Sequence, residues 1–219
     1  SEEEERLLLS VQSPIVLLRI KENNFIAEDI SKGNNYYGVM LPYTPLHHIL
    51  MEELNIPVVA TSGNLSDEPI CITNEEAFEK LHDIADYFLT HNRKIVRQVD
   101  DSVVRIIKNK PFMIRRARGY APYPVILNED VPPAIAVGGQ LKNTVAISNG
   151  KNVFISQHIG DLDSKEAFSA FKKIISDFKS LYDVNPEYII SDLHPDYVST
   201  KFAQDTGLKL VQVQHHYAH

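Results

Sequence analysis

The chain has 219 residues, of which 43% are hydrophobic and 23% charged, values typical of globular proteins rather than of disordered or fibrous ones. Its formal net charge of -7 argues against a broad nucleic-acid-binding face, because such faces need clustered Lys and Arg. The single cysteine, Cys71, excludes a disulfide framework and a zinc site built from several thiolates, and it fits a reducing cytoplasm. No apolar run approaches the roughly 20 residues that span a bilayer, so no membrane role is indicated.

The first 120 residues predict a mixed α/β domain, because strand-like and helix-like segments alternate. Strands are expected at residues 15–20, 37–41, 58–60 and 87–89. Helices are expected at 45–54 and at 75–83, the second with Asn74 as its N-cap. Residues 102–107 and 112–116 are expected to pair as a hairpin. The opening Ser1 to Leu7 reads as the middle of a helix and lacks an initial Met, so we expect further residues upstream.

A segment rich in proline and glycine divides the chain. Residues 118–133 contain four prolines and one glycine, so we expect no regular structure over most of this length. We place the domain boundary near residue 130, which gives one domain at 1–130 and another at 131–219.

The second domain predicts the element order βββαβαβ. Strands are expected at 134–137, 144–148, 153–156, 188–190 and 208–213, and helices at 164–182 and 197–204. The second and third strands would join through Asn149-Gly150, a tight-hairpin signal. This order matches the first half of the ribonuclease-H-like core shared by actin, sugar kinases and Hsp70. The fold class expected for the whole chain is therefore α/β, and the fold alone indicates no substrate.

Two groups of residues in the first domain suit a nucleotide or an acyl group. Ser62 and Asn64 follow the predicted strand 58–60, where they suit either an anion site or an ordinary turn with a helix N-cap. Permanently charged guanidinium groups, which can bind phosphate or carboxylate oxygens with two hydrogen bonds, are present at Arg115, Arg116 and Arg118. Strand alternation would put Arg116 and Arg118 on one face and Arg115 on the other, and a solvated strand edge is the alternative for all three.

The second domain carries a glycine turn and a histidine pair. Gly138-Gly139 followed by Lys142-Asn143-Thr144 lies where an actin-like fold places its first phosphate loop, although an ordinary glycine hairpin explains these residues equally well. His215 and His219 are four apart at the expected start of a helix, which puts both imidazoles on one face, as two metal ligands require. His158, Asp161, Asp192 and His194 could border the same cleft, and a helix cap also explains Asp192 or Asp163.

Motifs in both domains resemble the HypF-type carbamoyltransferases of nickel-iron hydrogenase maturation. Those that resemble the family's YrdC-like domain are residues 37–48, 59–69, 91–93, 100–103 and 115–122. Those that resemble its second domain are residues 138–144, 156–162, 192–197 and 215–219. Their order and number make chance a poor explanation, and together they cover nearly the whole chain.

The resemblance implies a two-stage reaction. The YrdC-like domain would use ATP, with Mg²⁺, to make carbamoyl-adenylate from carbamoyl phosphate, with the nucleotide near Ser62, Asn64 and Ser102. The second domain would transfer the carbamoyl group to the C-terminal cysteine of the partner HypE, and dehydration of the thiocarboxamide would give the cyanide ligand of the hydrogenase. No nucleic-acid or membrane partner is expected.

The resemblance also implies a divalent metal, zinc or iron, in the complete second domain. The His-x-x-x-His site of threonylcarbamoyl-transferase relatives matches His215 and His219 here. Acidic ligands in that family come from later sequence, so we expect this chain alone to bind metal weakly or not at all and these histidines to face solvent.

Two alternatives stay open from the sequence. The first is a tRNA-modification enzyme that forms threonylcarbamoyl-adenylate; stand-alone YrdC relatives of that type commonly carry Arg where this chain has Met40, which favours carbamate. The second is a nucleotide-binding fragment that is inactive alone. The family's basic opening motif, acylphosphatase-like domain and zinc-finger modules are expected upstream of Ser1, so we predict that this chain alone does not complete the transfer.

Overall fold

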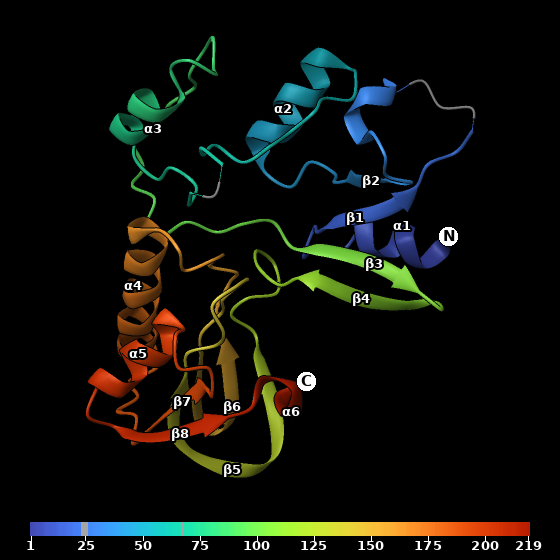
Figure 1. The fold of residues 1–219 in the computed structure, drawn as a ribbon. Helices are drawn as coiled ribbons and strands as arrows, with labels where there is room; N and C mark the ends of the chain where they lie inside the picture. The colour runs from blue at the N-terminus through green and yellow to red at the C-terminus, as the bar shows by residue number, and fades with distance from the viewer. Residues whose placement is uncertain (23–25, 67) are drawn as a thin grey trace. The chain divides into compact units, whose positions relative to one another are not determined.

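The computed structural model describes residues 1–22, 26–66 and 68–219 (Figure 1), so Asp67 in one of the family motifs lies outside the described residues. The expected mixed α/β class is confirmed, with two four-stranded mixed sheets. The chain folds into two compact units, of which unit 1 comprises Ser1–Thr61 and Asp101–Tyr120, and unit 2 comprises Ser62–Asp100 and Ala121–His219. The domain boundary near residue 130 stays a prediction. None of the described helices is long and apolar enough to cross a membrane.

Unit 1 is built on the sheet β2-β1-β3-β4. Its elements are α1 (Glu2–Leu8), β1 (Ile15–Arg19), the short 3₁₀ helix η1 (Glu28–Ser31), β2 (Tyr36–Val39), α2 (Pro45–Leu54), β3 (Val103–Ile107) and β4 (Lys110–Arg115). β1 and β3 run parallel, and β3 and β4 form the predicted hairpin. Leu7, Val16 and Val104 form the buried core between α1 and the sheet.

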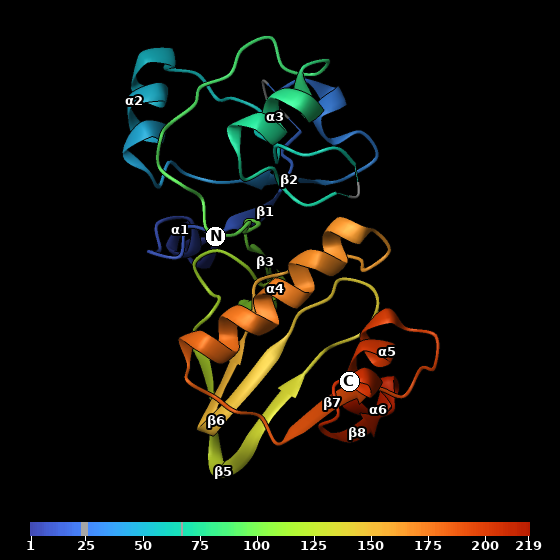
Figure 2. The ribbon, with the colours of Figure 1, turned by 90° about the vertical axis from the view of Figure 1, so that its left-hand side faces the viewer.

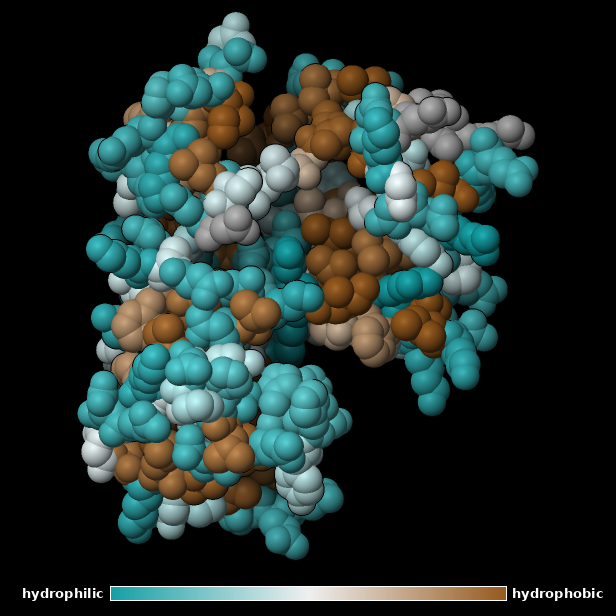
Figure 3. All heavy atoms as spheres, in the orientation of Figure 1, coloured by the Kyte–Doolittle hydropathy of each residue, from teal (hydrophilic) through white to brown (hydrophobic). Residues whose placement is uncertain are grey.

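The ends of the unit 1 helices follow local chemistry. Ser1 caps α1 in a capping box with Glu4, and a continuation of this helix upstream stays a prediction. Thr44 caps α2, with Pro45 at its first position. α2 buries none of its residues, and Figure 3 shows apolar surface over it, where Leu46, Ile49 and Leu50 are exposed.

Unit 2 is built on the sheet β6-β5-β7-β8. Its elements are α3 (Asn74–Leu81), β5 (Pro124–Ala136), β6 (Ala146–Ile155), α4 (Lys165–Leu181), β7 (Tyr188–Asp192), α5 (Val198–Asp205), β8 (Lys209–Val213) and α6 (His215–Ala218). β5, β7 and β8 are parallel, and β6 is antiparallel to β5. Figures 1 and 2 show α4 and α5 on one face of this sheet.

The core of unit 2 lies between that face and the two helices. Phe171, Ile174 and Phe178 of α4 pack with Ile135 and Ile189 of the sheet, all at most 3% exposed. Ser164 caps α4 by accepting a hydrogen bond from the Ala167 N–H at 3.0 Å. The predicted helix 164–182 is therefore confirmed, because a cap and a continuous apolar stripe both specify it.

Two predicted strands are wrong. Residues 58–60 and 87–89 have no regular structure, and apart from the half-buried Phe88 their side chains are exposed, with Val59 at 74% and Tyr87 at 94%. Short apolar runs favour strands only where a neighbouring strand can pair with them, and these runs pair with no described strand. The predicted N-cap of α3 also shifts by one residue, because the Thr73 hydroxyl accepts from the Glu76 N–H.

The proline-rich segment 118–133, expected to be irregular, contains most of β5 instead. β5 accommodates Pro132 and Pro133 at an irregularity in its register with β6, between Val131 and Ala134. Asn149-Gly150 forms no tight hairpin, because both residues lie inside β6, where Gly150 adopts φ +59° and pairs with Val131. The two strands expected at 144–148 and 153–156 are therefore one strand, which follows β5 directly.

Candidate functional site

The carboxyl ends of three parallel strands meet at one edge of the unit 2 sheet. β5 ends at Ala136, shortly before Gly138-Gly139, β7 ends at Asp192, and β8 is followed by Gln214 and His215. In open α/β sheets this edge is where ligands bind. The predicted glycine turn and the predicted histidine pair therefore belong to one site.

The glycine turn requires glycine at its first position. Gly138 has φ +65°, and a Cβ there would lie 2.5 Å from the Thr144 carbonyl oxygen. The Gly138 carbonyl accepts a hydrogen bond from the Ser199 hydroxyl of α5 at 3.0 Å, which ties the turn to the helix. The N–H groups of Gly139 and Gln140 have no hydrogen-bond acceptor among the described residues, so the turn can present backbone donors to an oxyanion.

Asn143 holds the turn from inside. It is 1% exposed, and its side-chain amide Nδ2 donates to the carbonyl oxygens of Val137 at 2.8 Å and Gly139 at 2.6 Å. Its backbone N–H donates to the Gly160 carbonyl. Among the described side chains, its Oδ1 is one of the buried atoms without a hydrogen-bond partner. Because both amide protons are engaged, Asn143 supports the phosphate loop predicted here and does not have a side-chain donor left for a phosphate.

Two aspartates anchor the rest of the loop. The Lys142 N–H donates to Asp161 Oδ1 at 2.7 Å, and Lys142 itself adopts φ +48° with an exposed side chain. Gln140 Nε2 donates to Asp163 Oδ1 at 2.7 Å, while Gln140 Oε1 accepts from the Val198 N–H at the start of α5. The loop is therefore fixed on both sides, and the Lys142 ammonium extends into solvent.

His215 forms a hydrogen-bonded pair with Asp192. His215 Nδ1 lies 2.7 Å from Asp192 Oδ2, and the Asp192 side chain is 7% exposed whereas that of His215 is 49% exposed. A Cβ on Gly139 would lie 3.8 Å from Asp192 Oδ2 and from the His215 ring, so the pair adjoins the glycine turn. The role of Asp192 stayed open in the sequence analysis. The only sequence feature that pointed to a site residue there was an Asp at the carboxyl end of a predicted strand.

His219 adds a second imidazole beside His215. The two ring centroids are 4.8 Å apart, and both residues are exposed, as predicted. Because Nδ1 of His215 faces Asp192, its Nε2 is left for a ligand, an arrangement typical of metal-binding histidines. The residues described by the structure contain no group of three or more His, Cys, Asp or Glu arranged to hold a metal. The two imidazoles and the Asp192 carboxylate lie together, and metal binding by His215 and His219 stays a prediction.

In unit 1, the predicted site arginine Arg118 is tied into the fold. Its Nε donates to Asp101 Oδ1 at 2.7 Å, its Nη2 donates to the Ser13 carbonyl at 2.7 Å, and its guanidinium carbon lies 3.5 Å from the Tyr43 ring centroid. Burial raises the pKa of the Tyr43 hydroxyl. Arg118 thus joins three separate parts of unit 1.

The neighbouring predicted residues have different environments. Ser102 is 0% exposed, and its hydroxyl donates to the Arg118 carbonyl and accepts from the Ala117 N–H. Arg116 donates to the Tyr120 carbonyl at 2.9 Å, and burial lowers its pKa. Arg115 is half-buried at the end of β4. The structure brings Ser102 together with the Arg116–Arg118 segment, and their binding of nucleotide or acyl group stays a prediction.

Ser62 and Asn64 belong to unit 2. Ser62 is exposed, whereas the Asn64 amide Nδ2 donates to the carbonyls of Leu65 at 2.8 Å and Glu68 at 3.0 Å. The Cys71 N–H donates to the Gly63 carbonyl, which closes the same turn. Asn64 therefore organises this loop, as the turn interpretation of the sequence predicts, and its role in nucleotide binding stays a prediction.

Replacing Arg118 by Ala is expected to lower the unfolding free energy of unit 1 by about 2–4 kcal/mol, because charge-assisted hydrogen bonds and the ring contact are lost and Asp101 is left unpaired. Urea unfolding followed by circular dichroism measures this. Arg115→Ala is the matched control, since no hydrogen bond of its guanidinium is formed with a described residue, and we expect less than about 1 kcal/mol from it. Equal losses in both variants would contradict the anchoring role.

Two family models match the chain. Residues 1–117 match the Sua5/YciO/YrdC family, described as "Telomere recombination", and residues 129–219 match the "HypF Kae1-like domain". The first match alone covers more than half of the chain. The protein is thus of the class that joins a YrdC-type domain to a Kae1-like domain.

Similar proteins specify this class further. The chain is 50% identical over 217 residues to carbamoyltransferase HypF of Synechocystis sp. and 43% identical over 226 residues to that of Rhizobium leguminosarum. A crystal structure of full-length HypF in the phosphate- and nucleotide-bound form is 50% identical with a TM-score of 0.93, and that of T. kodakarensis HypF is 40% identical with a TM-score of 0.93. The chain belongs to the HypF family.

These similarities extend over nearly all of this chain but only part of each relative. The chain covers 28% of the Synechocystis protein and 30% of the Rhizobium protein, while 99% and 100% of this chain are matched. It covers 35% and 29% of the two crystallised chains, each of which matches 100% of it.

Proposed function

We propose that this chain is part of an ATP-dependent carbamoyltransferase of the cytoplasm. The relatives are named carbamoyltransferase HypF, and one of the crystallised HypF proteins holds phosphate and nucleotide. The observation that carries the proposal is the unit 2 edge, where a glycine turn whose N–H groups meet no acceptor from a described residue adjoins the Asp192–His215 pair. Backbone donors suit an oxyanion, and an oriented imidazole suits a metal or a reacting group.

In the proposed reaction, water first hydrolyses carbamoyl phosphate to carbamate and inorganic phosphate. A carbamate oxygen then attacks the α-phosphorus of ATP, and pyrophosphate leaves. The thiolate of the C-terminal cysteine of HypE then attacks the carbamoyl carbon, and AMP leaves. Adenylation supplies the leaving group, so the protein's task is to hold the reactants in line and to neutralise phosphate charge. Mg²⁺ would accompany the nucleotide phosphates.

The residues of unit 2 have definable parts in this scheme. The turn at Gly139 and Gln140 would bind phosphate oxygens through backbone N–H groups, and the exposed Lys142 ammonium would add positive charge. His215 and His219 would hold a divalent metal, zinc or iron, which supplies a Lewis acid when bound. Asp192 keeps the His215 ring in one orientation.

In unit 1, either Arg115 or Arg116, which strand alternation puts on opposite faces, would meet an anion. Arg118 already has Asp101 as its counter-ion, whereas no carboxylate of a described residue forms an ion pair with Arg115. Arg116 would have to exchange its contact with the Tyr120 carbonyl for a phosphate or acyl oxygen. Its partial burial would strengthen such an interaction, because water screens it less.

Transfer is tested with HypE, ATP and carbamoyl phosphate, by weighing HypE with mass spectrometry. We expect the complete protein to add the mass of one carbamoyl group to HypE and to need both ATP and carbamoyl phosphate. This chain alone should add none. A carbamoyl gain with this chain alone would contradict the need for further residues, and no gain with the complete protein would contradict the proposed function.

A further inference from the structure

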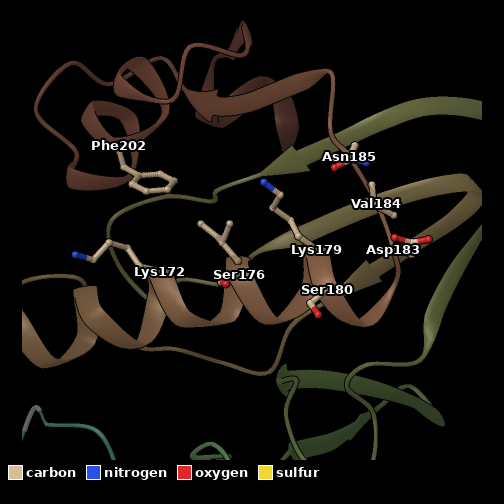
Figure 4. Close-up of a pocket in the computed structure, with 9 residues that line it drawn as sticks. Lys172, Ser176, Lys179, Ser180, Asp183, Val184, Asn185 and Phe202 are labelled. Atoms are coloured by element: carbon tan, nitrogen blue, oxygen red, sulfur yellow. The ribbon is translucent and has the colours of Figure 1, made fainter.

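A groove of about 460 Å³ on unit 2 lies away from the residues assigned to the candidate site. It runs along α4 and is bordered by Phe202 of α5 and by the connection that follows α4 (Figure 4). Its lining residues are Lys172, Ile175, Ser176, Lys179, Ser180, Asp183, Val184, Asn185 and Phe202. None of them contributes to the glycine turn or to the histidine pair.

The groove has an apolar floor and a polar border. Ile175 is 7% exposed and Val184 is 6% exposed, and the half-buried Phe202 ring faces α4 (Figure 4). Lys172, Ser176 and Lys179 recur at helical spacing along one side of α4, and all three are exposed. A molecule bound in the groove would therefore bury an apolar group on the floor and contact the polar border with hydrophilic groups.

Both lysines keep their positive charge available. The Lys172 ammonium lies over the Phe168 ring at 4.7 Å, and neither it nor Lys179 forms an ion pair with a described carboxylate. By contrast, the adjacent Lys173 pairs with Asp177 at 3.2 Å. In a chain with a formal net charge of -7, two unpaired ammonium groups beside an apolar floor form a local positive surface.

The spacing of the lysines selects the kind of occupant. Seven residues on a helix correspond to a rise of about 10 Å. The two ammonium groups therefore lie too far apart along α4 for one phosphate to contact both. Figure 4 shows their side chains leaving α4 on either side of Ser176. A second helix with two carboxylates seven residues apart would place one opposite each lysine.

We propose that this groove docks an acidic amphipathic helix of a protein partner. Two Glu or Asp side chains, seven residues apart, contact Lys172 and Lys179. An apolar side chain between them packs on Ile175, Val184 and Phe202. Asp183 at the end of the groove disfavours a third acidic residue there and fixes the direction in which the helix binds.

The test uses a fluorescent synthetic helix with two Glu seven residues apart and a Leu between them, titrated with the chain by anisotropy. We expect Lys172→Glu with Lys179→Glu to weaken binding at least tenfold. The matched control is Lys151→Glu with Lys209→Glu, two exposed lysines of unit 2 outside the groove, which should change affinity less than twofold. Replacing the Leu of the probe by Ser should weaken binding at least fivefold.

Several outcomes would overturn the proposal. Absence of binding would do so, and so would equal binding of the probe by the two double variants. Equal binding of the Leu and Ser probes would also do so, because it would mean charge attraction without docking of the apolar side chain. Amide signals of Ser176, Ser180 and Asn185 in NMR spectra should shift with the helix. If inorganic phosphate shifts them and chloride of equal ionic strength does not, the groove is a phosphate site and the helix proposal is wrong.

Discussion

Replacing Asn143 by Asp is expected to lower the unfolding free energy of unit 2 by at least about 3 kcal/mol at neutral pH. The substitution keeps the shape of the side chain but replaces the amide donor by a carboxylate oxygen. That oxygen would face the carbonyls of Val137 and Gly139, which now accept at 2.8 and 2.6 Å. A charge buried against two acceptors has no favourable contact there.

The sign of the pH dependence separates this cause from simple loss of shape. Burial and the two carbonyls raise the folded-state pKa of the introduced carboxyl above its unfolded value, so protonation favours the folded state. The variant should therefore regain stability as the pH falls through that raised pKa, since a protonated carboxyl can donate one hydrogen bond. Denaturant unfolding at pH 7 and pH 5 measures the difference relative to the unchanged chain.

The matched control for this variant is Asn149→Asp, the same change at an exposed position of β6. It should cost less than about 0.5 kcal/mol and show little added pH dependence. If Asn143→Asp were as stable as the control, the two carbonyl contacts would not be what holds the glycine turn.

Elements with local signals could be predicted from the sequence. The helix α4 has Ser164 as its cap and an apolar stripe along its whole length, so its bounds followed from neighbouring residues alone. The hairpin of β3 and β4 likewise follows from two strand-like runs around a short connection. Such signals come from residues close together in the sequence and do not depend on the tertiary structure.

Elements whose existence depends on distant partners could not be predicted. Val58 to Ala60 has the composition of a buried strand, but no described strand pairs with it. Conversely, β5 continues through Pro132 and Pro133 because Pro carbonyls still accept hydrogen bonds: Pro132 accepts from the Ser148 hydroxyl, and Pro133 from the Glu187 N–H. A local proline count misses these long-range contacts.

The candidate site shows the same division. The turn at Gly138-Gly139 and the two neighbouring imidazoles could be predicted from residue type and spacing, and metal binding by the histidines stays a prediction. Two features depend on tertiary structure: Asp192 and His215 meet across 23 residues, and Asn143 turns its amide inward to the backbone. Neither can be read from residue type, since an Asp after a strand and an Asn in a turn are common.

Replacing Asp192 by Asn in the complete protein is expected to weaken metal binding and to slow carbamoyl transfer, each by about 10- to 100-fold. The Asp192 carboxylate accepts from His215 Nδ1 at 2.7 Å, while an amide in its place presents either a weaker acceptor or a donor. The His215 ring would lose its fixed orientation, and Nε2 would no longer be held toward a metal. Metal content by mass spectrometry, zinc and iron titrations and the rate of carbamoyl gain on HypE measure the two effects.

Asp196→Asn is the matched control, because Asp196 is exposed and its carboxylate forms no hydrogen bond with a described residue. It should bind metal and transfer carbamoyl within twofold of the unchanged protein. His215→Ala removes the ring itself and should have a larger effect than Asp192→Asn on both readouts. If Asp192→Asn retained full metal affinity while transfer fell, Asp192 would act on the reacting groups rather than through His215; if neither changed, the pair would have no part in the site.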